Sequence, residues 1–263
     1  MRITYIGHAT LLIELGGRIF LTDPNFDASL GRLLPRVSAP GILLHELPRV
    51  DAVFVTHAHA DHLSFDSLDG LPRDIPIYAP PAIARWLKRR GYGCAKGLAP
   101  GEVVENGPVG IRATAATHKG HRYGIDRWRG DANMYLFDTN SLSCLFAGDT
   151  ALTPESTHIV ELQLAPESRR LDIALLPIGH APWWKPGFRK GHLTSTDALT
   201  FFERLNARYL IPYHWGTFDH VTSKAHDAID RLRTQLPAHS RGADVRILEP
   251  GAVFELPVEE KEM

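Results

Sequence analysis

The stretch AVFVTHAHADH, residues 52–62, joins a short apolar run to a cluster of three histidines and one aspartate. The run at residues 52–55 is typical of a strand buried on both faces of a sheet. Because the cluster follows it directly, its side chains are expected where the chain leaves a rigid scaffold, which is a common place for functional groups. Imidazole and carboxylate groups are ligands that suit zinc and related first-row metals. The stretch therefore predicts a metal site at the end of a buried strand.

The spacing within this cluster indicates how its side chains are directed. In extended backbone, residues two apart point the same way, so His57 and His59 can offer imidazoles to one metal. Asp61 and His62 come as the chain turns towards a helix, and they can address a second point nearby. A solvated loop that happens to hold these residues is the alternative, and their density directly after an apolar strand disfavours it.

Three later residues stand in comparable places, each near the end of a predicted strand. They are His118 after residues 109–116, Asp149 after residues 143–147 and His214 after residues 209–211. Any one of them alone is as well explained as a hydrogen-bonded histidine or a turn aspartate. As a set they favour metal binding, because a site along one edge of a sheet needs side chains from several strand ends.

The remaining chain alternates short strands with helices, with Gly16-Gly17 as a hairpin turn and Thr194 as an expected helix N-cap. The predicted strands are residues 2–6, 10–15, 18–22, 52–55, 102–105, 109–116, 132–138, 143–147, 172–176, 209–211 and 244–248, and the predicted helices are residues 82–90, 155–164, 194–206 and 222–236. Residues 24–49 are expected to form an irregular loop. Strands come first and helices are placed to cover sheet faces, which predicts an α/β (α+β) fold, a four-layer αββα sandwich. Without a linker or repeat, residues 1–263 are expected to form one domain.

The composition is that of a soluble globular protein, with 44% hydrophobic and 22% charged residues. The net charge of -1 gives no support to a nucleic-acid partner. Cys94 and Cys144 cannot form a disulfide framework, and the apolar N-terminal stretch lacks a cleavage site, so a cytoplasmic location is expected. No run approaches the roughly 20 apolar residues of a transmembrane helix. The sequence indicates no particular oligomeric state.

With these motifs the sequence resembles the metallo-β-lactamase superfamily, whose signature H-x-H-x-D-H stands at residues 57–62. The resemblance extends over nearly the whole chain and is carried also by residues 5–10, 21–24, 146–150 and 213–217. It implies an αββα sandwich with a metal site at one edge of the sheets. It also implies two divalent metal ions, with zinc as the default and manganese or iron as alternatives.

The resemblance further implies a role for each candidate residue. A first metal would take His57, His59 and His118, a second would take Asp61, His62 and His214, and Asp149 would bridge the two. His121 is a possible competitor for His118, which lies nearer the strand end. Asp61 would also orient the nucleophile, and His192 would lie over the metals as a substrate-binding or proton-transfer group. The alternative for His192 is a residue at a helix entry that contributes only a cap.

Within the superfamily, the branch that contains N-acylphosphatidylethanolamine phospholipase D and ascorbate-6-phosphate lactonase is the most similar. The similarity lies in residues 176–179, 191–194 and 214–218, although His180-Ala181-Pro182 departs from the phospholipase pattern. The expected activity is a dinuclear hydrolase whose metal-bridging hydroxide attacks a phosphoester or phosphodiester. A lactonase is the alternative within the branch. A non-catalytic metal-binding module is the alternative of another class, and the presence of all seven candidate ligands disfavours it.

Two other classes within the fold fit the sequence poorly. A diiron oxidoreductase would carry a glutamate where His59 stands and would need a flavin-binding partner domain. A β-lactamase would normally carry an export signal. Neither feature is visible in the sequence.

Two loops with basic and aromatic residues bear on the substrate. They contain Lys119, Arg122, Tyr123, Arg127, Trp128 and Arg129 in the first, and Trp183, Trp184, Lys185, Arg189 and Lys190 in the second. If both loops border the metals, they favour an anionic or phosphorylated small-molecule substrate with an apolar part. Solvated charges and packing aromatics are the alternative.

Overall fold

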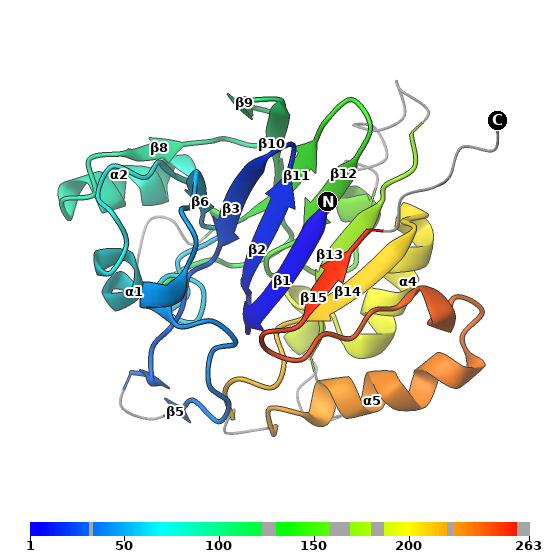
Figure 1. The fold of residues 1–263 in the computed structure, drawn as a ribbon. Helices are drawn as coiled ribbons and strands as arrows, with labels where there is room; N and C mark the ends of the chain where they lie inside the picture. The colour runs from blue at the N-terminus through cyan, green and yellow to red at the C-terminus, as the bar shows by residue number, and fades with distance from the viewer. Residues whose placement is uncertain (32–33, 123–129, 158–168, 180–186, 220–222, 257–263) are drawn as a thin grey trace.

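A computed structural model of the chain describes residues 1–31, 34–122, 130–157, 169–179, 187–219 and 223–256. Over these residues two large β-sheets pack face to face, and helices lie on both outer sides (Figure 1). The predicted α/β fold with a four-layer αββα arrangement is confirmed. Among the described residues, no helix has the length and apolar character needed to cross a membrane.

The first sheet has seven strands. Its order is β15 (Val253–Glu255), β1 (Arg2–Gly7), β2 (Thr10–Leu15), β3 (Arg18–Thr22), β6 (Ala52–Phe54), β7 (Ile77–Ala79) and β8 (Ala95–Gly97). Neighbours are antiparallel from β15 to β3 and parallel from β3 to β8. Gly16 and Gly17 have φ values of 57° and 73°, the conformation that a tight two-residue hairpin turn requires between β2 and β3.

The second sheet has six strands. Its order is β14 (Tyr209–Tyr213), β13 (Ile173–Pro177), β12 (Ser143–Phe146), β11 (Asn133–Asp138), β10 (Val109–Ala115) and β9 (Val103–Asn106). Neighbouring strands are antiparallel from β9 to β12 and parallel from β12 to β14. Because parallel strands end at the same edge of a sheet, the residues that follow β12 and β14 are brought to one place.

Strand β6 carries the sequence that leads into the metal cluster, and it is buried on both faces. Phe54 points into the space between the sheets, where its ring centroid lies 5.0 Å from that of Phe137 in the second sheet. Val53 points the other way, into the cluster beneath helix α2 (Pro81–Arg89), where Leu87 is also buried. Removing a buried aromatic such as Phe54 costs about 3–5 kcal/mol, so the strand is firmly held.

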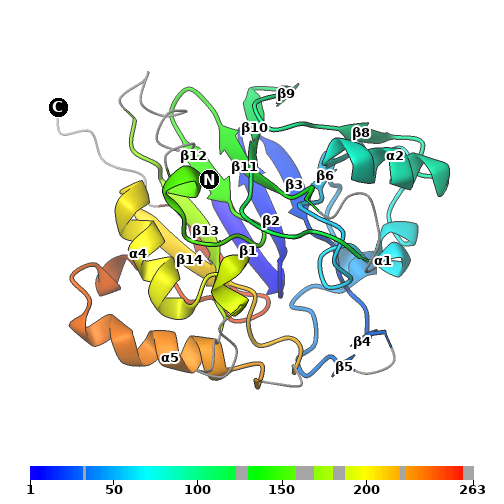
Figure 2. The ribbon, with the colours of Figure 1, turned by 180° about the vertical axis from the view of Figure 1, so that it is seen from behind.

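The helices form the two outer layers. Helices α1 (Phe65–Asp69) and α2 cover the outer face of the first sheet, and α4 (Ser195–Leu205) covers the second sheet with α5 (Asp227–Gln235) beside it (Figure 2). Helix α4 begins at the predicted N-cap, Thr194, in a capping box with Asp197. Its buried face carries Phe201 and Phe202, which pack on the sheet.

Several short elements are not predicted by the sequence. They are β7 and β8 together with β4 (Ser29–Leu30), β5 (Leu34–Pro35) and the 3-10 turns η1 (Leu44–Glu46), η3 (Phe188–Lys190), η4 (Leu236–Ala238) and η5 (Gly242–Asp244), whereas α1 is the helix expected after His62. Residues 24–49 are otherwise irregular, as expected. The predicted helix 155–164 extends past residue 157, outside the described residues.

The prediction of a final strand at residues 244–248 is wrong. Val245 makes only an isolated bridge with Leu210, and the last strand of the sequence is β15, which pairs with β1. Val245 and Leu248 are nevertheless buried against the core, which explains the apolar pattern. A buried irregular segment and a strand can share such a short pattern, so the pattern alone does not distinguish them.

Candidate metal centre

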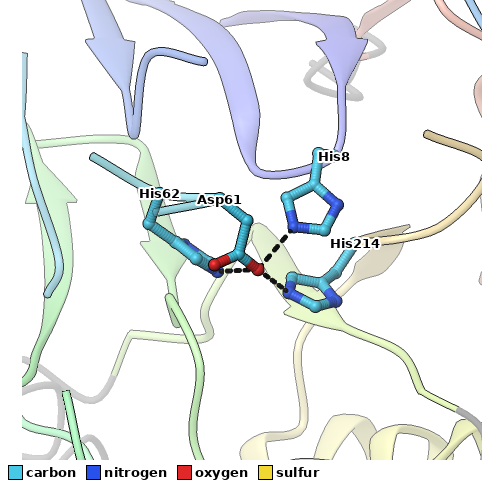
Figure 3. A group of neighbouring side chains, drawn as sticks. All are labelled: His8, Asp61, His62 and His214. Atoms are coloured by element: carbon cyan, nitrogen blue, oxygen red, sulfur yellow. Dashed lines mark hydrogen bonds and ion pairs between the residues drawn. The ribbon is translucent and has the colours of Figure 1, made fainter. Parts of the chain in front are cut away.

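All seven predicted ligands come together at one edge of the sandwich, in loops that follow strand ends. Their ligand atoms form two groups, within each of which the atoms lie no more than 4.8 Å apart. One group contains His57, His59, His118 and Asp149, and the other contains Asp61, His62, His214 and a further residue, His8. The division of the histidines and of Asp61 between the groups is the one that the resemblance implies, with His8 added. Figure 3 shows the second group, His8, Asp61, His62 and His214.

The second group has the separations that a bound metal requires. Oδ2 of Asp61 lies 3.6 Å from Nε2 of His62 and 3.5 Å from Nε2 of His214. Asp149 lies 3.5 Å from His62 Nε2 through Oδ2 and 3.4 Å from His214 Nε2 through Oδ1. Four ligands about 2.0–2.2 Å from one tetrahedral zinc ion would lie roughly 3.3–3.6 Å from one another. These atoms therefore fit around one such ion.

The first group is formed mainly by imidazoles. His59 Nδ1 lies 2.9 Å from His57 Nε2 and 3.1 Å from His118 Nε2. Oδ2 of Asp149 lies 3.9 Å from Nε2 of both His57 and His118, and the same oxygen faces His62 in the other group. Asp149 thus stands between the groups, where the sequence predicts a bridging carboxylate.

Hydrogen bonds from the outer side direct the ring nitrogens towards the centre. His118 Nδ1 donates to the carbonyl of Gly191 at 2.7 Å, which leaves Nε2 with its lone pair. The Thr56 hydroxyl donates to Asp23 at 2.7 Å, so it can only accept from His57 Nδ1, 2.9 Å away. The Nε2 atoms of His57 and His118 therefore carry lone pairs, which are directed at His59 Nδ1 at 2.9 and 3.1 Å and are the atoms that would bind a cation.

Three buried polar atoms at the centre have no hydrogen-bond partner among the described residues. They are His62 Nε2, His214 Nε2 and Asp149 Oδ1. A buried polar atom without a partner costs about 1–3 kcal/mol, so such a concentration calls for a ligand. These atoms are two imidazole nitrogens and one carboxylate oxygen, and all three face the centre. Because such atoms are typical metal ligands, a divalent cation would satisfy all of them.

The electrostatics favour the same ligand. Burial, reinforced by the neighbouring histidines, lowers the pKa of His57 well below its usual value and that of His118 to about 4. Burial alone would raise the pKa of Asp61 and Asp149, but the adjacent histidines outweigh it and hold both pKa values well below the usual range. Ionised Asp61 and Asp149 beside the neutral imidazoles of His57 and His118 attract a cation. At His62, burial is outweighed by the same carboxylates together with Asp23, which raise its pKa well above the usual value.

A model of the beta-lactamase superfamily domain matches residues 18–215, more than half of the chain. The chain belongs to the beta-lactamase superfamily. It is 29% identical over 260 residues to the N-acyl-phosphatidylethanolamine-hydrolyzing phospholipase D 1 of Caenorhabditis elegans, covering 89% of this chain and 69% of that protein. It is 30% identical over 260 residues to a metal-dependent hydrolase of Heliobacterium modesticaldum, covering 97% of this chain and 98% of that protein.

The comparisons establish the class of enzyme. The chain is a metal-dependent hydrolase of the superfamily. Among solved structures, isothiocyanate hydrolase from Delia radicum gut bacteria superposes with a TM-score of 0.78 at 21% identity, covering 97% of this chain and 99% of that one. At this identity the likeness concerns the fold alone.

Two residues of this superfamily hydrolase contact the predicted ligands and were given no role from the sequence. His8, in the connection between β1 and β2, hydrogen-bonds Asp61 through Nε2 at 3.0 Å. Asp23, after β3, accepts hydrogen bonds from the backbone and hydroxyl of Thr56, each 2.7 Å long, and from His62. Both residues follow the end of a buried apolar strand. A polar side chain in such a place is the sequence feature that could have marked them as part of the site.

The backbone is strained at three residues around the second group. His8, Asp23 and His214 have φ values of 55°, 34° and 70°, in the left-handed region that favours glycine. Each such residue costs about 1–3 kcal/mol, and such strain is characteristic of functional sites.

His192, predicted to bind substrate or to transfer a proton, lies beside the centre. Its Nε2 is 3.5 Å from Asp149 Oδ2, its Nδ1 is 3.2 Å from the carbonyl of Phe188, and its ring stacks on the Phe188 ring. A third of its side chain is exposed. Thr194 forms the N-cap of α4, so His192 does not serve as the cap. The His192 imidazole faces the centre instead. His121 belongs to neither metal group, and its Nδ1 faces the carbonyl of Lys119.

A cavity of about 500 Å³ opens over the centre and is largely apolar. His8, His59, Asp61, Asp149, His192 and His214 contribute to its lining. Its remaining walls include Leu30, Leu34, Ile178, Phe188, Trp215 and Phe218. Of the described residues that line it, Lys224 is the one lysine or arginine, and its ammonium pairs with Asp219 at 3.1 Å.

The described basic residues of the two loops do not line this cavity. Arg122 donates to the carbonyl of Leu63 at 2.6 Å and so supports the ligand loop. Arg189 pairs with Asp197 at the start of α4, with an N···O separation of 3.2 Å. Lys119 and Lys190 are exposed. Tyr123, Arg127, Trp128, Arg129, His180, Ala181, Pro182, Trp183, Trp184 and Lys185 lie outside the described residues.

Proposed function

We propose that the chain is a dinuclear hydrolase that cleaves a phosphodiester carrying an apolar substituent. The observation that carries the proposal is the position of Asp149, whose Oδ2 faces histidines of both groups at the floor of an apolar cavity. A shared carboxylate between two clusters of nitrogen ligands supports a pair of cations rather than a single one.

The residues divide between two cations as follows. His57, His59 and His118 would hold one, Asp61, His62 and His214 would hold the other, and Asp149, which lies beside histidines of both groups, would be available to either. Two divalent ions bound there supply Lewis acidity and lower the pKa of water at the centre. Zinc suits this mixture of imidazole and carboxylate ligands, and manganese or iron are the alternatives.

The side chains of the protein complete the chemistry. Asp61, partly exposed to the cavity, orients the attacking water by accepting a hydrogen bond from it. His192 lies on the cavity side of Asp149 and donates a proton to the leaving alkoxide, while the water adds its oxygen to phosphorus. The P–O bond to the leaving group breaks, and the products are an alcohol and a phosphomonoester. The second proton of the water returns His192 to its acid form through solvent.

The cavity supports the substrate class. Its apolar walls accommodate an acyl or aryl group. A phosphodiester carries a single negative charge, which the cations themselves offset. The similarity to a C. elegans phospholipase D that hydrolyses N-acyl-phosphatidylethanolamine supports the same reaction class.

The experiment is a metal-dependent assay on a small panel of substrates. The chain is purified without added metal, loaded with zinc or manganese, and tested on bis(p-nitrophenyl) phosphate, a diacyl phospholipid, a lactone and a β-lactam. Cleavage of the two phosphodiesters that stops on chelation supports the proposal. Cleavage of the lactone alone would replace it with the lactonase alternative. A chain that binds metal but cleaves nothing would favour the non-catalytic module.

The apolar cavity can be tested separately with Phe218→Ala. Removing this ring from the wall should lower kcat/KM for the diacyl phospholipid by about tenfold more than for bis(p-nitrophenyl) phosphate, because about 1–2 kcal/mol of apolar contact is lost only with the long chains. Phe254→Ala on β15, which does not line the cavity, is the matched control. Equal losses on both substrates would contradict this placement of the chains.

A further inference from the structure

His8 lies beside the candidate ligands of the second group, although it was given no role there from the sequence. It lies in the connection between β1 and β2, is 6% exposed, and lines the cavity above the second group. Its φ of 55° is held by contacts on several sides. Its carbonyl accepts a hydrogen bond from the backbone of His214 at 2.9 Å, and the two rings lie 4.0 Å apart between centroids. The edge of the Phe218 ring packs against it as well.

The distances separate His8 from the imidazoles of the same group. All three rings converge on Oδ2 of Asp61, as Figure 3 shows. His62 Nε2 and His214 Nε2 lie 3.6 and 3.5 Å from this oxygen, the spacing of two ligands on one metal. His8 Nε2 lies 3.0 Å away at hydrogen-bond length and has this partner, whereas His62 Nε2 and His214 Nε2 are buried without a hydrogen-bond partner among the described residues.

A carboxylate oxygen has two lone pairs that point in different directions. We assign one lone pair of Asp61 Oδ2 to the hydrogen bond from His8 and the other to a cation. If His8 donates its Nε2–H along one direction, the other faces the space between His62 and His214. The carboxylate is then unable to rotate away from that space. Hydrogen bonds of this kind orient a metal ligand, and their loss typically weakens metal binding 10–100-fold.

We propose that His8 is a positioning residue that fixes Asp61 by a hydrogen bond, so that the Asp61/His62/His214 site can hold its cation. This inference rests on the dinuclear centre of the proposed function. His8 itself is not a ligand of the cation. Its effect falls on one of the two sites, because no described contact joins its side chain to His57, His59 or His118.

The test compares His8→Gln with His8→Met. The two replacements have similar length and equal backbone strain, but only glutamine offers an N–H near the position of Nε2. Zinc binding is followed by calorimetric titration, and cobalt binding by its visible absorption. The wild type should bind two ions per chain. His8→Met should weaken one of the two binding steps 10–100-fold, and His8→Gln should stay within about threefold of the wild type.

The same two substitutions in a chain that lacks one ligand of the first group show which of the two metal sites is affected. In a chain with His59→Ala, which removes a ligand of the first group, the remaining ion should still respond to His8→Met and not to His8→Gln. Urea unfolding of the metal-free proteins should give the same stability for the two variants, so that a difference in metal binding does not come from folding.

Each other outcome overturns the inference. Wild-type affinity in His8→Met would mean that the hydrogen bond does not matter, and equal loss in both variants would make His8 a ligand or a steric support. A wild-type chain that binds a single ion would overturn the dinuclear centre and, with it, the role of His8. Two ions in the wild type with unaffected variants would overturn the role of His8 alone and leave the proposed function standing.

Discussion

Asp23 Oδ2 lies 2.7 Å from Nδ1 of His62, and both side chains are fully buried although 39 residues separate them in the chain. The carboxylate accepts the Nδ1–H of the ring, so Nε2, which faces Asp61 and Asp149, is the nitrogen that remains to bind a cation. Asp23 therefore prepares His62 for metal binding from the side opposite to the cation.

Asp23→Asn should weaken metal binding at the His62 site 10–100-fold, because the amide carries no charge to polarise the ring. The free energy of unfolding should also fall by about 1–3 kcal/mol, since both Thr56 donors lose a carboxylate acceptor. Zinc titration and urea unfolding measure the two effects. Asp230→Asn, on the exposed surface of α5, is the matched control. Wild-type affinity in Asp23→Asn would contradict this role.

Asp149→Asn should weaken both metal sites at once, whereas substitutions of other ligands should affect one. Its Oδ2 faces His57, His62 and His118, so the loss of its charge is felt in both groups. His59→Ala and His214→Ala are the matched comparisons, and each should leave about one ion per chain. Elemental analysis after dialysis distinguishes these cases. One tightly bound ion in Asp149→Asn would show that the carboxylate does not bridge.

The acid stability of the metal-free protein should depend on His118. Its pKa is lowered from 6.5 to about 4 by burial, so the unfolded chain takes up a proton there first. The contribution of His118 to stability should therefore be lost as the pH falls from about 6.5 to about 4 and stay constant below that window. His118→Gln should remove up to about 3 kcal/mol of this loss, because glutamine does not titrate. Urea unfolding between pH 4 and pH 8 in the presence of chelator is the measurement, with pH 8 as the baseline; identical pH profiles would refute the assignment.

His192→Gln should lower kcat roughly 10²–10⁴-fold while two metal ions remain bound. Glutamine keeps the size of the side chain but cannot transfer a proton to the leaving oxygen. His121→Gln is the control, because His121 lies in neither metal group and should retain both metals and activity. Loss of metal in His192→Gln would instead make His192 a ligand.

The close approach of the candidate ligands could be predicted from the sequence for a physical reason. His57, His59, Asp61 and His62 lie within six residues of one another, directly after a strand whose position in the sheet follows from its apolar sequence. Local geometry alone brings such residues together. The parallel strands β12 and β14 then place Asp149 and His214 at the same edge.

The parts that the sequence does not predict depend on contacts between distant segments. His8 reaches Asp61 across 53 residues, and nothing in the local pattern around either residue specifies that hydrogen bond. The basic loop residues show the same limitation, because Arg122 binds a backbone carbonyl 59 residues away instead of facing the cavity. The apolar residues 245–248 likewise pack without forming a strand, which only the tertiary structure decides.

The left-handed conformations of His8, Asp23 and His214 set a limit on engineering this enzyme for heat resistance. Glycine would adopt these conformations without strain. A search guided only by folding energy would therefore be drawn to replace the very side chains that the metal centre needs. Stabilising substitutions are better sought on the exposed face of α2, which contributes no residue to the described lining of the cavity and where gains in melting temperature need not trade against turnover.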